Sequence, residues 1–529
     1  MTYTAPLFLF IFLPLVMLFY KLMPQKHRWK ILLIASYIFF ALVSGKLIVF
    51  LLLSTFSIHH FGLWLSNFNN ECDTEIVGVE RAERKIIKQK YQKKKLKVLV
   101  LAVVIHIGIL LVLKYSNFIG NNLNALLGKL SFAYTLPAFK FALPIGISFY
   151  TLQAISYMVD VYRGTIKADK NLGRLALFLG FFPQIMEGPI CRYSQTAEKL
   201  FEGAPITYKN MTYGMQRIIY GLFKKMVVAD RLNVLIVNVF DKYPEYSGAV
   251  VFVGMICYTC QLYMDFSGTM DIVIGCGEIF GVSLPENFRQ PFFSRNVSEF
   301  WTRWHISLGA FFKDYIFYPL SLSKPLKKMT SKGRKLFGNH FGPLLAGSCA
   351  LFVVWFCNGL WHGSAWNYIF FGMYYFFLIV LSNFTAPLSN KILAFLHINK
   401  HNPIYIGWQI LRTVILVNIG ELFFRANGFQ AGFVMFKKMF TNFNVADFTN
   451  GFLLKLGMDK KDFIVVIAAV ILVFVISIFH EKNIHLRDEI AKRNIFIRFT
   501  IYYIAILLVI IFGAYGGTYT PVPMMYAGF

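Results

Sequence analysis

The sequence predicts an all-α integral membrane protein that crosses the bilayer about 10–13 times. Composition is the first observation that predicts this class. Hydrophobic residues fill 57% of the 529 positions and charged residues only 15%, whereas a soluble domain carries about 25% charged residues. The second observation is that apolar runs long enough to cross a hydrocarbon core of about 30 Å recur along the whole chain. Together these observations exclude an ordinary soluble domain.

The charge distribution supports the same class. The formal net charge is +27, from 53 basic and 26 acidic residues. Such an excess could indicate nucleic-acid binding in a soluble protein, but here the basic residues cluster in short segments between apolar runs. Cytoplasmic loops that face anionic lipid have this pattern. We therefore expect membrane lipid as a partner and no nucleic acid.

The first apolar run, Leu7–Tyr20, has no charged residue and no basic leader, so we interpret it as an uncleaved span. The basic residues of Lys21–Lys30 follow directly and place that loop in the cytoplasm, with the amino terminus outside. Ile31–Leu65 is long enough for one span and a partial second. The polar stretch Asn67–Lys97 is expected to form a helical arm that lies on lipid headgroups in the cytoplasm.

Further runs of apolar residues predict the remaining spans. They are Val98–Leu113, Phe139–Val161, Leu175–Ile185, Ile218–Phe240 (interrupted by Lys224 and Lys225), Ala249–Tyr263, Gly342–Trp361, Tyr368–Leu381, Ile404–Phe424, Phe463–Phe479 and Phe499–Ala514. The lysine-rich stretch Leu320–Asn339 is predicted to be a second basic loop in the cytoplasm. Without a repeat or a soluble segment, a single membrane-embedded domain over residues 1–529 is the most economical interpretation.

Two segments do not fit simple bundle helices. Phe182–Arg192 combines two prolines and a glycine with the carboxylate of Glu187. Gln261–Asp271 places Asp265 and a second carboxylate after an apolar run. Irregular or charged chain at membrane depth is tolerated only where it lines a cavity or is buried in protein. Transporters also contain such segments, so they do not decide between chemistry and transport.

His362 is the most informative single residue. It lies in Leu351–Met373, a run without Lys, Arg, Asp or Glu. An ionisable side chain at that depth is a functional-site hypothesis by default, and imidazole suits general-base catalysis. The alternative is a histidine that only hydrogen-bonds a neighbouring helix. Asn358 lies one turn earlier and would orient the ring if the helix continues through Gly359.

A second histidine follows an irregular segment. The chain after Leu284 is predicted to enter a helix near Asn296 or Ser298, on which Trp301 and His305 share a face. Arg303 and Trp304 would point to other faces. An interfacial amphipathic helix explains this pattern whatever the function. His305 is therefore either a second catalytic residue or a structural one. The seven cysteines, including Cys257 and Cys260, show no metal-ligand spacing, so we expect no metal and no disulfide framework.

Five motifs occur in one order along the chain. They are Tyr263–Gly268 (YMDFSG), Leu284–Phe288 (LPENF), Phe300–Leu308 (FWTRWHISL), Lys313–Leu320 (KDYIFYPL) and Gly359–Gly363 (GLWHG). In this order the motifs resemble the membrane-bound O-acyltransferases. The resemblance is to the bacterial branch with the alginate O-acetyltransferase membrane subunit and the teichoic-acid D-alanyl transfer protein. It covers residues 139–426. Ser321–Lys324 departs from the Gly-Gly-Asn-Arg stretch of many relatives, which leaves donor contacts in that loop unassigned.

The resemblance implies many helices around a central funnel that is open to a cytoplasmic donor and an extracellular acceptor. It makes His362 and His305 the matches to the two histidines of the family. The supporting residues expected along the substrate tunnel are Asn358, Trp361, Trp304, Arg303, Asp265 and Glu187. His362 would take the proton of an acceptor hydroxyl, or receive the acyl group covalently and pass it on.

The expected activity is transfer of an acyl group, first of all acetyl, to hydroxyls of an extracellular or cell-wall polysaccharide. Because the chain has no Walker loop and no Gly-x-Ser-x-Gly elbow, the acyl group must arrive activated, on acetyl-CoA or on an acyl carrier protein as a thioester. We expect no bound cofactor and a separate extracytoplasmic acyltransferase as partner. D-alanyl transfer to teichoic acid from a carrier protein is the alternative, and a transporter without covalent chemistry is a remote one. A bacterial plasma membrane is the expected location.

Overall fold

A computed structural model describes residues 2–131, 134–515, 519 and 521–522, so the carboxyl-terminal Pro523–Phe529 lies outside the described residues. Every named element in the described part is a helix, and one isolated antiparallel bridge joins Phe288 to Trp304. The described residues form two compact units. Unit 1 holds the described residues up to Met215 together with Val273–Pro285, and unit 2 holds Gln216–Ile272 and the described residues from Glu286 onward. The predicted all-α class is confirmed.

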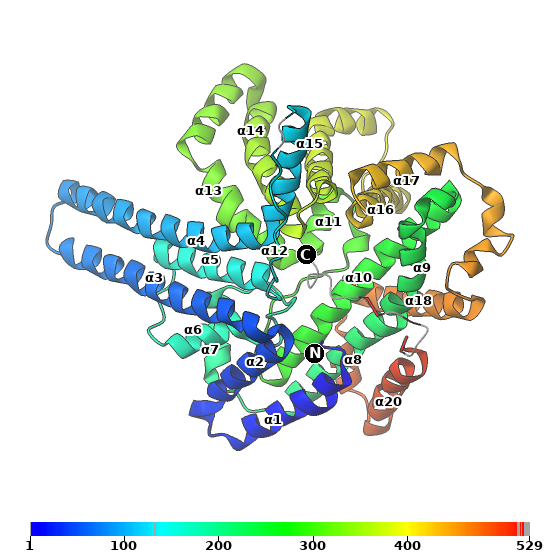
Figure 1. Cartoon of the computed structure of the whole chain (residues 1–529), viewed down its shortest axis with the longest axis horizontal. Helices are drawn as coiled ribbons and strands as arrows, with labels where there is room; N and C mark the ends of the chain where they lie inside the picture. Colours follow the sequence, from blue (N-terminus) through cyan, green and yellow to red (C-terminus); the bar gives the residue numbers. More distant parts are fainter. Residues whose placement is uncertain (1, 132–133, 516–518, 520, 523–529) are drawn as a thin grey trace. The chain divides into compact units, whose positions relative to one another are not determined.

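Figure 1 labels most of the helices of the two units. Unit 1 contains α1 (Leu13–Leu22), α2 (Arg28–Ser44), α3 (Ile48–Glu75), α4 (Arg81–Lys129), α5 (Ile147–Arg163), α6 (Leu172–Gly180) and α7 (Tyr193–Glu202). Helices α8 (Tyr208–Leu222) and α10 (Gly248–Ile279) contribute to both units. Unit 2 contains α9 (Asp230–Asp241), α11 (Val297–Arg303), α12 (Ile306–Phe312), α13 (Tyr318–Ser321), α14 (Lys324–His362), α15 (Trp366–Phe395), α16 (Pro403–Arg425), α17 (Phe429–Thr441), α18 (Lys460–Glu481), α19 (Leu486–Ala491) and α20 (Ile495–Phe512).

Eight helical stretches among the described residues are long and apolar enough to cross a membrane, and the shorter Leu7–Leu22 is also apolar. Eight is below the 10–13 spans expected from sequence, because the 51-residue stretch Gln25–Glu75 holds both α2 and α3 and because other expected runs are short or interrupted. Phe139–Val161 gives the 17-residue α5 and Leu175–Ile185 the nine-residue α6. The run from Ile218 is divided into α8, a π-helical turn at Phe223–Ala229 and α9. The chain is a multi-pass membrane protein.

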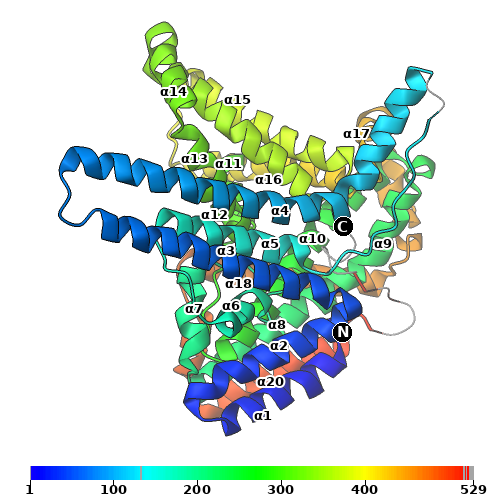
Figure 2. The same ribbon diagram turned by 60° about the vertical axis from the view of Figure 1, so that its left-hand side comes forward.

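In unit 1, α3 and α4 form a long antiparallel hairpin (Figures 1 and 2). The arm predicted over Asn67–Lys97 is helical, but it consists of the end of α3 and the start of α4 rather than a separate helix. Lys95 Nζ donates to Asn69 Oδ1 at 2.7 Å, and Lys90 Nζ lies 3.1 Å from Glu75 Oε1. These contacts join the two helices at their polar ends. The position of the arm on lipid headgroups stays a prediction.

In unit 2, α14 and α15 lie side by side in both views (Figures 1 and 2). Glycines set their distance, because a Cβ on Gly372 would lie 2.3 Å from the Trp355 carbonyl oxygen, and one on Gly359 would lie 2.5 Å from the Tyr368 carbonyl oxygen. Helix α16 approaches α15 in the same way, with Gly420 against the Tyr375 hydroxyl. Small residues that let helix backbones approach closely are the usual interface of membrane helices.

The prediction that Leu320–Asn339 forms a loop is wrong, because most of this stretch is helical. Most of this stretch forms the first turns of α14, and the helix is broken at Gly338, whose φ is +77°. Its lysines are exposed on a helix rather than on a loop. Lysine is a good helix former, and the positive charge that suggested a loop carries no preference against helix.

The packing of α14 on α15 can be tested at Gly372. We expect Gly372→Ala to lower the free energy of unfolding by about 1–3 kcal/mol, because the added methyl group clashes with backbone rather than with a flexible side chain. The measurement is the thermal unfolding midpoint in detergent. Gly347→Ala is the matched control, since a Cβ at Gly347 of α14 meets nothing within 4 Å. If the two variants unfold at the same temperature, the backbones of α14 and α15 do not approach each other closely at Gly372.

Candidate active site

The segment that carries His305 turns instead of continuing as one helix. Asn296 caps α11, its Oδ1 accepting from the Glu299 N–H at 2.9 Å. The backbone leaves the helix at Trp304, which is extended and pairs with Phe288, and His305 adopts a left-handed conformation with φ +48° before α12 begins. The single helix predicted through residue 305 is therefore wrong, and Trp301 and His305 do not share a helical face. The Trp304 N–H still donates to the Phe300 carbonyl, and the bonds of the bridge run from the Arg289 N–H to the Arg303 carbonyl and from the Ile306 N–H to the Asn287 carbonyl.

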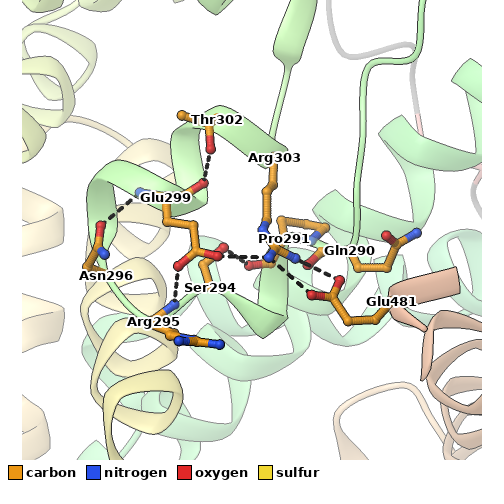
Figure 3. A network of polar contacts seen from close by, with 9 residues as sticks. All are labelled: Gln290, Pro291, Ser294, Arg295, Asn296, Glu299, Thr302, Arg303 and Glu481. Carbon is orange, nitrogen blue, oxygen red and sulfur yellow. Dashed lines mark hydrogen bonds and ion pairs between the residues drawn. The ribbon is translucent and has the colours of Figure 1, made fainter. Parts of the chain in front are cut away.

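Arg303 anchors this turn, as Figure 3 shows. Its guanidinium donates to Glu299 Oε1 at 2.8 Å and to both carboxylate oxygens of Glu481 at 2.8 and 3.1 Å. Glu299 Oε2 accepts from the Arg295 backbone N–H at 2.9 Å. Glu481 is the last residue of α18, so Arg303 ties the end of α11 to a distant helix of the same unit. A bidentate arginine–carboxylate pair fixes orientation as well as distance.

His305 is buried in the turn, with 3% of its surface exposed. Asn287, which is fully buried, faces it: Asn287 Oδ1 lies 3.4 Å from His305 Nδ1 and accepts from the N–H and the hydroxyl of Ser307, each at 2.9 Å. The Phe266 ring meets the imidazole edge to face at 4.8 Å. Burial lowers the pKa of His305 to about 3, so the ring is neutral at neutral pH.

His362 is the last residue of α14 and is 6% exposed. Its ring lies 5.0 Å from Trp361, 5.7 Å from Phe371 and 5.2 Å from Phe424, between ring centroids. The Trp361 ring also lies 5.5 Å from the His305 ring. Trp361 therefore contacts both histidines, and the structure brings together residues that are 57 positions apart in the sequence.

Helix α14 continues through Gly359 to His362, which is the condition for Asn358 to share the face of the histidine. Asn358 is buried, and its Oδ1 has no hydrogen-bond partner among the described residues. On α16, Glu421 lies one turn before Phe424 and is 1% exposed; its Oε2 also lacks a partner in the described part of the chain. The sequence analysis did not single out Glu421, although a carboxylate inside the apolar run Ile404–Phe424 is the signal that could have found it.

Asp265 of α10 belongs to a buried group of charged side chains with Lys225 of the π-helical turn and Asp230 of α9. A second group in unit 2 joins Asp271 of α10 to Lys224 and to Arg217 of α8. Lys225 Nζ lies 2.5 Å from Asp265 Oδ1, and Lys224 Nζ lies 2.5 Å from Asp271 Oδ2. Arg217 contacts Asp271 at 3.0 Å and Glu286 at 2.5 Å. Asp265 is therefore an ion-pair partner of a buried lysine, which the sequence analysis noted only as an interruption of an apolar run.

The remaining two sequence-predicted residues have different surroundings. Trp304 packs among aromatic rings, at 5.0 Å from Phe288 and 5.4 Å from Phe300, so it holds the turn that carries His305. Glu187 is buried in unit 1, in the irregular segment between α6 and α7, whereas both histidines belong to unit 2. Within the described residues, no group of three His, Cys, Asp or Glu side chains is placed to hold a metal ion.

Comparison with known proteins agrees with the motifs. The family model described as MBOAT, membrane-bound O-acyltransferase family, matches residues 167–333. The chain is 32% identical to the probable alginate O-acetylase of Pseudomonas aeruginosa, over 83% of this chain and 75% of that protein. It is 29% identical to the peptidoglycan O-acetyltransferase of Helicobacter pylori over 64% of each chain. It is 30% identical to the teichoic acid D-alanyltransferase of Bacillus subtilis, over 47% of this chain and 60% of that one.

The anchoring role of Arg303 predicts the effect of its removal. We expect Arg303→Ala to lower the free energy of unfolding by about 1–3 kcal/mol, since it leaves Glu299 and Glu481 without their cation. Thermal unfolding in detergent measures this change. Lys492→Ala is the control, because Lys492 pairs with Glu489 at an exposed site, where ion pairs contribute little. If Arg303→Ala unfolds at the same temperature as Lys492→Ala, Arg303 is not an anchor.

Proposed function

The chain belongs to the membrane-bound O-acyltransferase family, and we propose that it moves an acetyl group from a cytoplasmic thioester toward hydroxyls of an extracellular or cell-wall polysaccharide. The family follows from the relative that is 32% identical over 75% of its own length. The chain is thus an O-acyltransferase embedded in the membrane by many spans. The acyl group, the acceptor polymer and the direction of transfer are the parts that we propose.

Two of the relatives support acetyl as the transferred group, since their names describe O-acetylation of alginate and of peptidoglycan. The match to the D-alanyltransferase covers 47% of this chain, whereas the match to the alginate relative covers 83%. D-alanyl transfer is therefore the second candidate. As an O-acyltransferase, the chain takes an acyl thioester as donor. Coenzyme A and an acyl carrier protein are the two thioester carriers that we propose, and a separate extracytoplasmic acyltransferase is the proposed partner.

The convergence of two buried histidines on Trp361 is the observation that supports the proposed catalytic residues. In the proposed step, His362 takes the proton as the acceptor hydroxyl oxygen attacks the thioester carbonyl carbon. The carbon–sulfur bond then breaks, and the departing thiolate takes the proton from the imidazolium. A positioned base contributes about 10²–10⁴-fold to the rate. His305, whose neutral ring contacts the same Trp361 ring, is proposed as the second catalytic residue.

We propose a separate role for each supporting residue. Trp361 sets the spacing of the two imidazoles, and Asn358 offers an oxygen acceptor one turn from His362. Trp304 and Arg303 hold the turn of His305. Asp265 neutralises buried Lys225, and Glu187 stays a proposed supporting residue of the substrate tunnel.

The catalytic proposal is tested by mass spectrometry of cell-surface polymers. Strains with the intact gene, a deletion, His362→Ala and His305→Ala are compared at matched protein level in the membrane. We expect acetyl esters to disappear in the deletion and in His362→Ala, and to fall at least tenfold in His305→Ala, because a lost base costs about 10²–10⁴-fold.

Each other outcome has one meaning. Loss of D-alanyl esters would replace the acetyl proposal with the second candidate. Ester content that is unchanged in the deletion, in a strain without a second copy of the gene, would contradict acyl transfer to surface polymers. His362→Ala with full ester content would remove His362 from the proposed step. Flux of a solute that changes without any change in esters would favour a transporter.

The exposed lysines at the start of α14 are proposed to attract the acidic donor. Replacing Lys327, Lys328 and Lys332 by Gln is expected to raise the apparent KM for the donor severalfold, with a larger effect at low salt, because exposed charges are screened. The basic arm at the start of α4 is proposed to attract the donor in the same way, and a parallel variant replaces its exposed Lys88, Lys93 and Lys97 by Gln. An unchanged donor KM in the α14 variant, with membrane topology preserved, would contradict docking at α14.

A further inference from the structure

Asn287 is held in place by its backbone and by its side chain. Its carbonyl oxygen accepts from the Ile306 N–H at 3.0 Å, and the neighbouring Phe288 pairs with Trp304. Its Oδ1 accepts from the N–H and the hydroxyl of Ser307. Asn287 therefore bonds to both residues that follow His305 and cannot shift without moving the turn.

The hydrogen bonds also determine which way the amide of Asn287 points. A backbone N–H can only donate, so the atom that faces Ser307 N at 2.9 Å must be the amide oxygen. The amide nitrogen then points to Met270 Sδ at 3.2 Å, and a thioether sulfur is a weak acceptor that suits an N–H. Both ends of the amide thus have the partner that their chemistry requires, and a flipped amide would lose both contacts.

This orientation has a consequence for His305. The atom 3.4 Å from His305 Nδ1 is an oxygen without a proton, so a hydrogen bond between them requires the proton to be on Nδ1. A neutral imidazole carries a single N–H. The proton on Nδ1 therefore leaves Nε2 as the nitrogen with a lone pair, able to accept a hydrogen bond or a proton.

We propose that Asn287 is a positioning residue that holds His305 in the Nδ1–H tautomer and so fixes Nε2 as the ring nitrogen that carries the lone pair. This inference rests on the proposed function, in which His305 takes part in acyl transfer to a hydroxyl. The hydrogen bond that one ring nitrogen makes sets the role of the other, as in other histidine sites. Asn287 touches neither donor nor acceptor in this scheme and acts only through His305.

The left-handed backbone of His305 supports the same conclusion. A non-glycine residue at φ +48° costs free energy and persists only where its surroundings hold it there. The contacts of Asn287 with Ile306 and Ser307 and the Phe288–Trp304 pair supply that restraint. Right-handed helical conformations at both Trp304 and His305 would continue α11 and carry the ring away from Asn287.

The first experiment reads the tautomer directly. Protein with ¹⁵N-labelled histidine in detergent is measured by NMR, and His305→Ala identifies the signal of His305 by its disappearance. We expect this signal to show a protonated Nδ1 and an unprotonated Nε2. A protonated Nε2 in the otherwise unchanged protein would overturn the proposal. This measurement does not depend on whether any variant of Asn287 folds.

The second experiment separates positioning from general stability by a double-mutant cycle. Asn287→Ala is expected to lower kcat about 10–100-fold while the donor KM stays within twofold. Loss of the hydrogen-bond partner of a metal-binding histidine has an effect of this size at metal sites. In a His305→Ala background the same substitution should change kcat less than twofold. Ser294→Ala, which removes another fully buried hydrogen bond of this segment, is the control and should leave kcat unchanged.

The outcomes distinguish this inference from the proposed function. An equal loss of kcat from Asn287→Ala in both backgrounds would mean that Asn287 only supports the fold, which overturns the inference. Full activity of His305→Ala would overturn it as well, because His305 would then have no catalytic role to position. In that case, loss of activity in His362→Ala would still support acyl transfer at this site.

Discussion

The structure of unit 2 depends on which groups form hydrogen bonds with the backbone N–H and C=O groups around the Trp304–His305 turn. In a membrane protein, a buried break in a helix is tolerated only if other groups take the bonds that the helix gives up. Here Arg289 donates to the Arg303 carbonyl at 2.9 Å, and Asn287 accepts from Ile306 and Ser307. Because these bonds are available, the chain can leave α11 and present His305 to Trp361, which no straight helix from Asn296 would do.

The buried charges of unit 2 follow a related rule. Lys224 and Lys225 lie in a π-helical turn and face Asp271 and Asp265 on α10. Removing ions from water costs several kcal/mol for each ion, so pairing of this kind limits a cost rather than adding stability. The pairs instead fix the rotational setting of α10 against the π-helical turn. Without its carboxylate, either lysine would be a buried charge whose desolvation is not compensated, and this would strongly destabilise the fold.

The class of fold was predictable from sequence, because it depends on properties that are local in the chain, whereas His305 joined His362 as a proposed catalytic residue only through the resemblance of the motifs to the family. Apolar runs identify spans, and an ionisable residue in such a run identifies His362. The break at Trp304 was not predictable, since it depends on pairing with Phe288 sixteen positions earlier. Asn287 lies in the motif Leu284–Phe288, but the motif alone predicts no role for it, because its partners are set by that same long-range pairing. Glu421 was missed although its local signal resembles that of His362.

The place of His362 at the end of α14 has an electrostatic consequence. The carbonyl groups of the last turn of a helix have no intrahelical partner and carry a partial negative charge, equivalent to roughly half an electron for the whole helix. A positive charge that forms at this end is stabilised by about 0.3–1 kcal/mol. Helix α16 also ends beside the site, with Phe424 in contact with His362. The aligned peptide dipoles of α14 thus point their negative end at the imidazole, where the proposed step creates a positive charge.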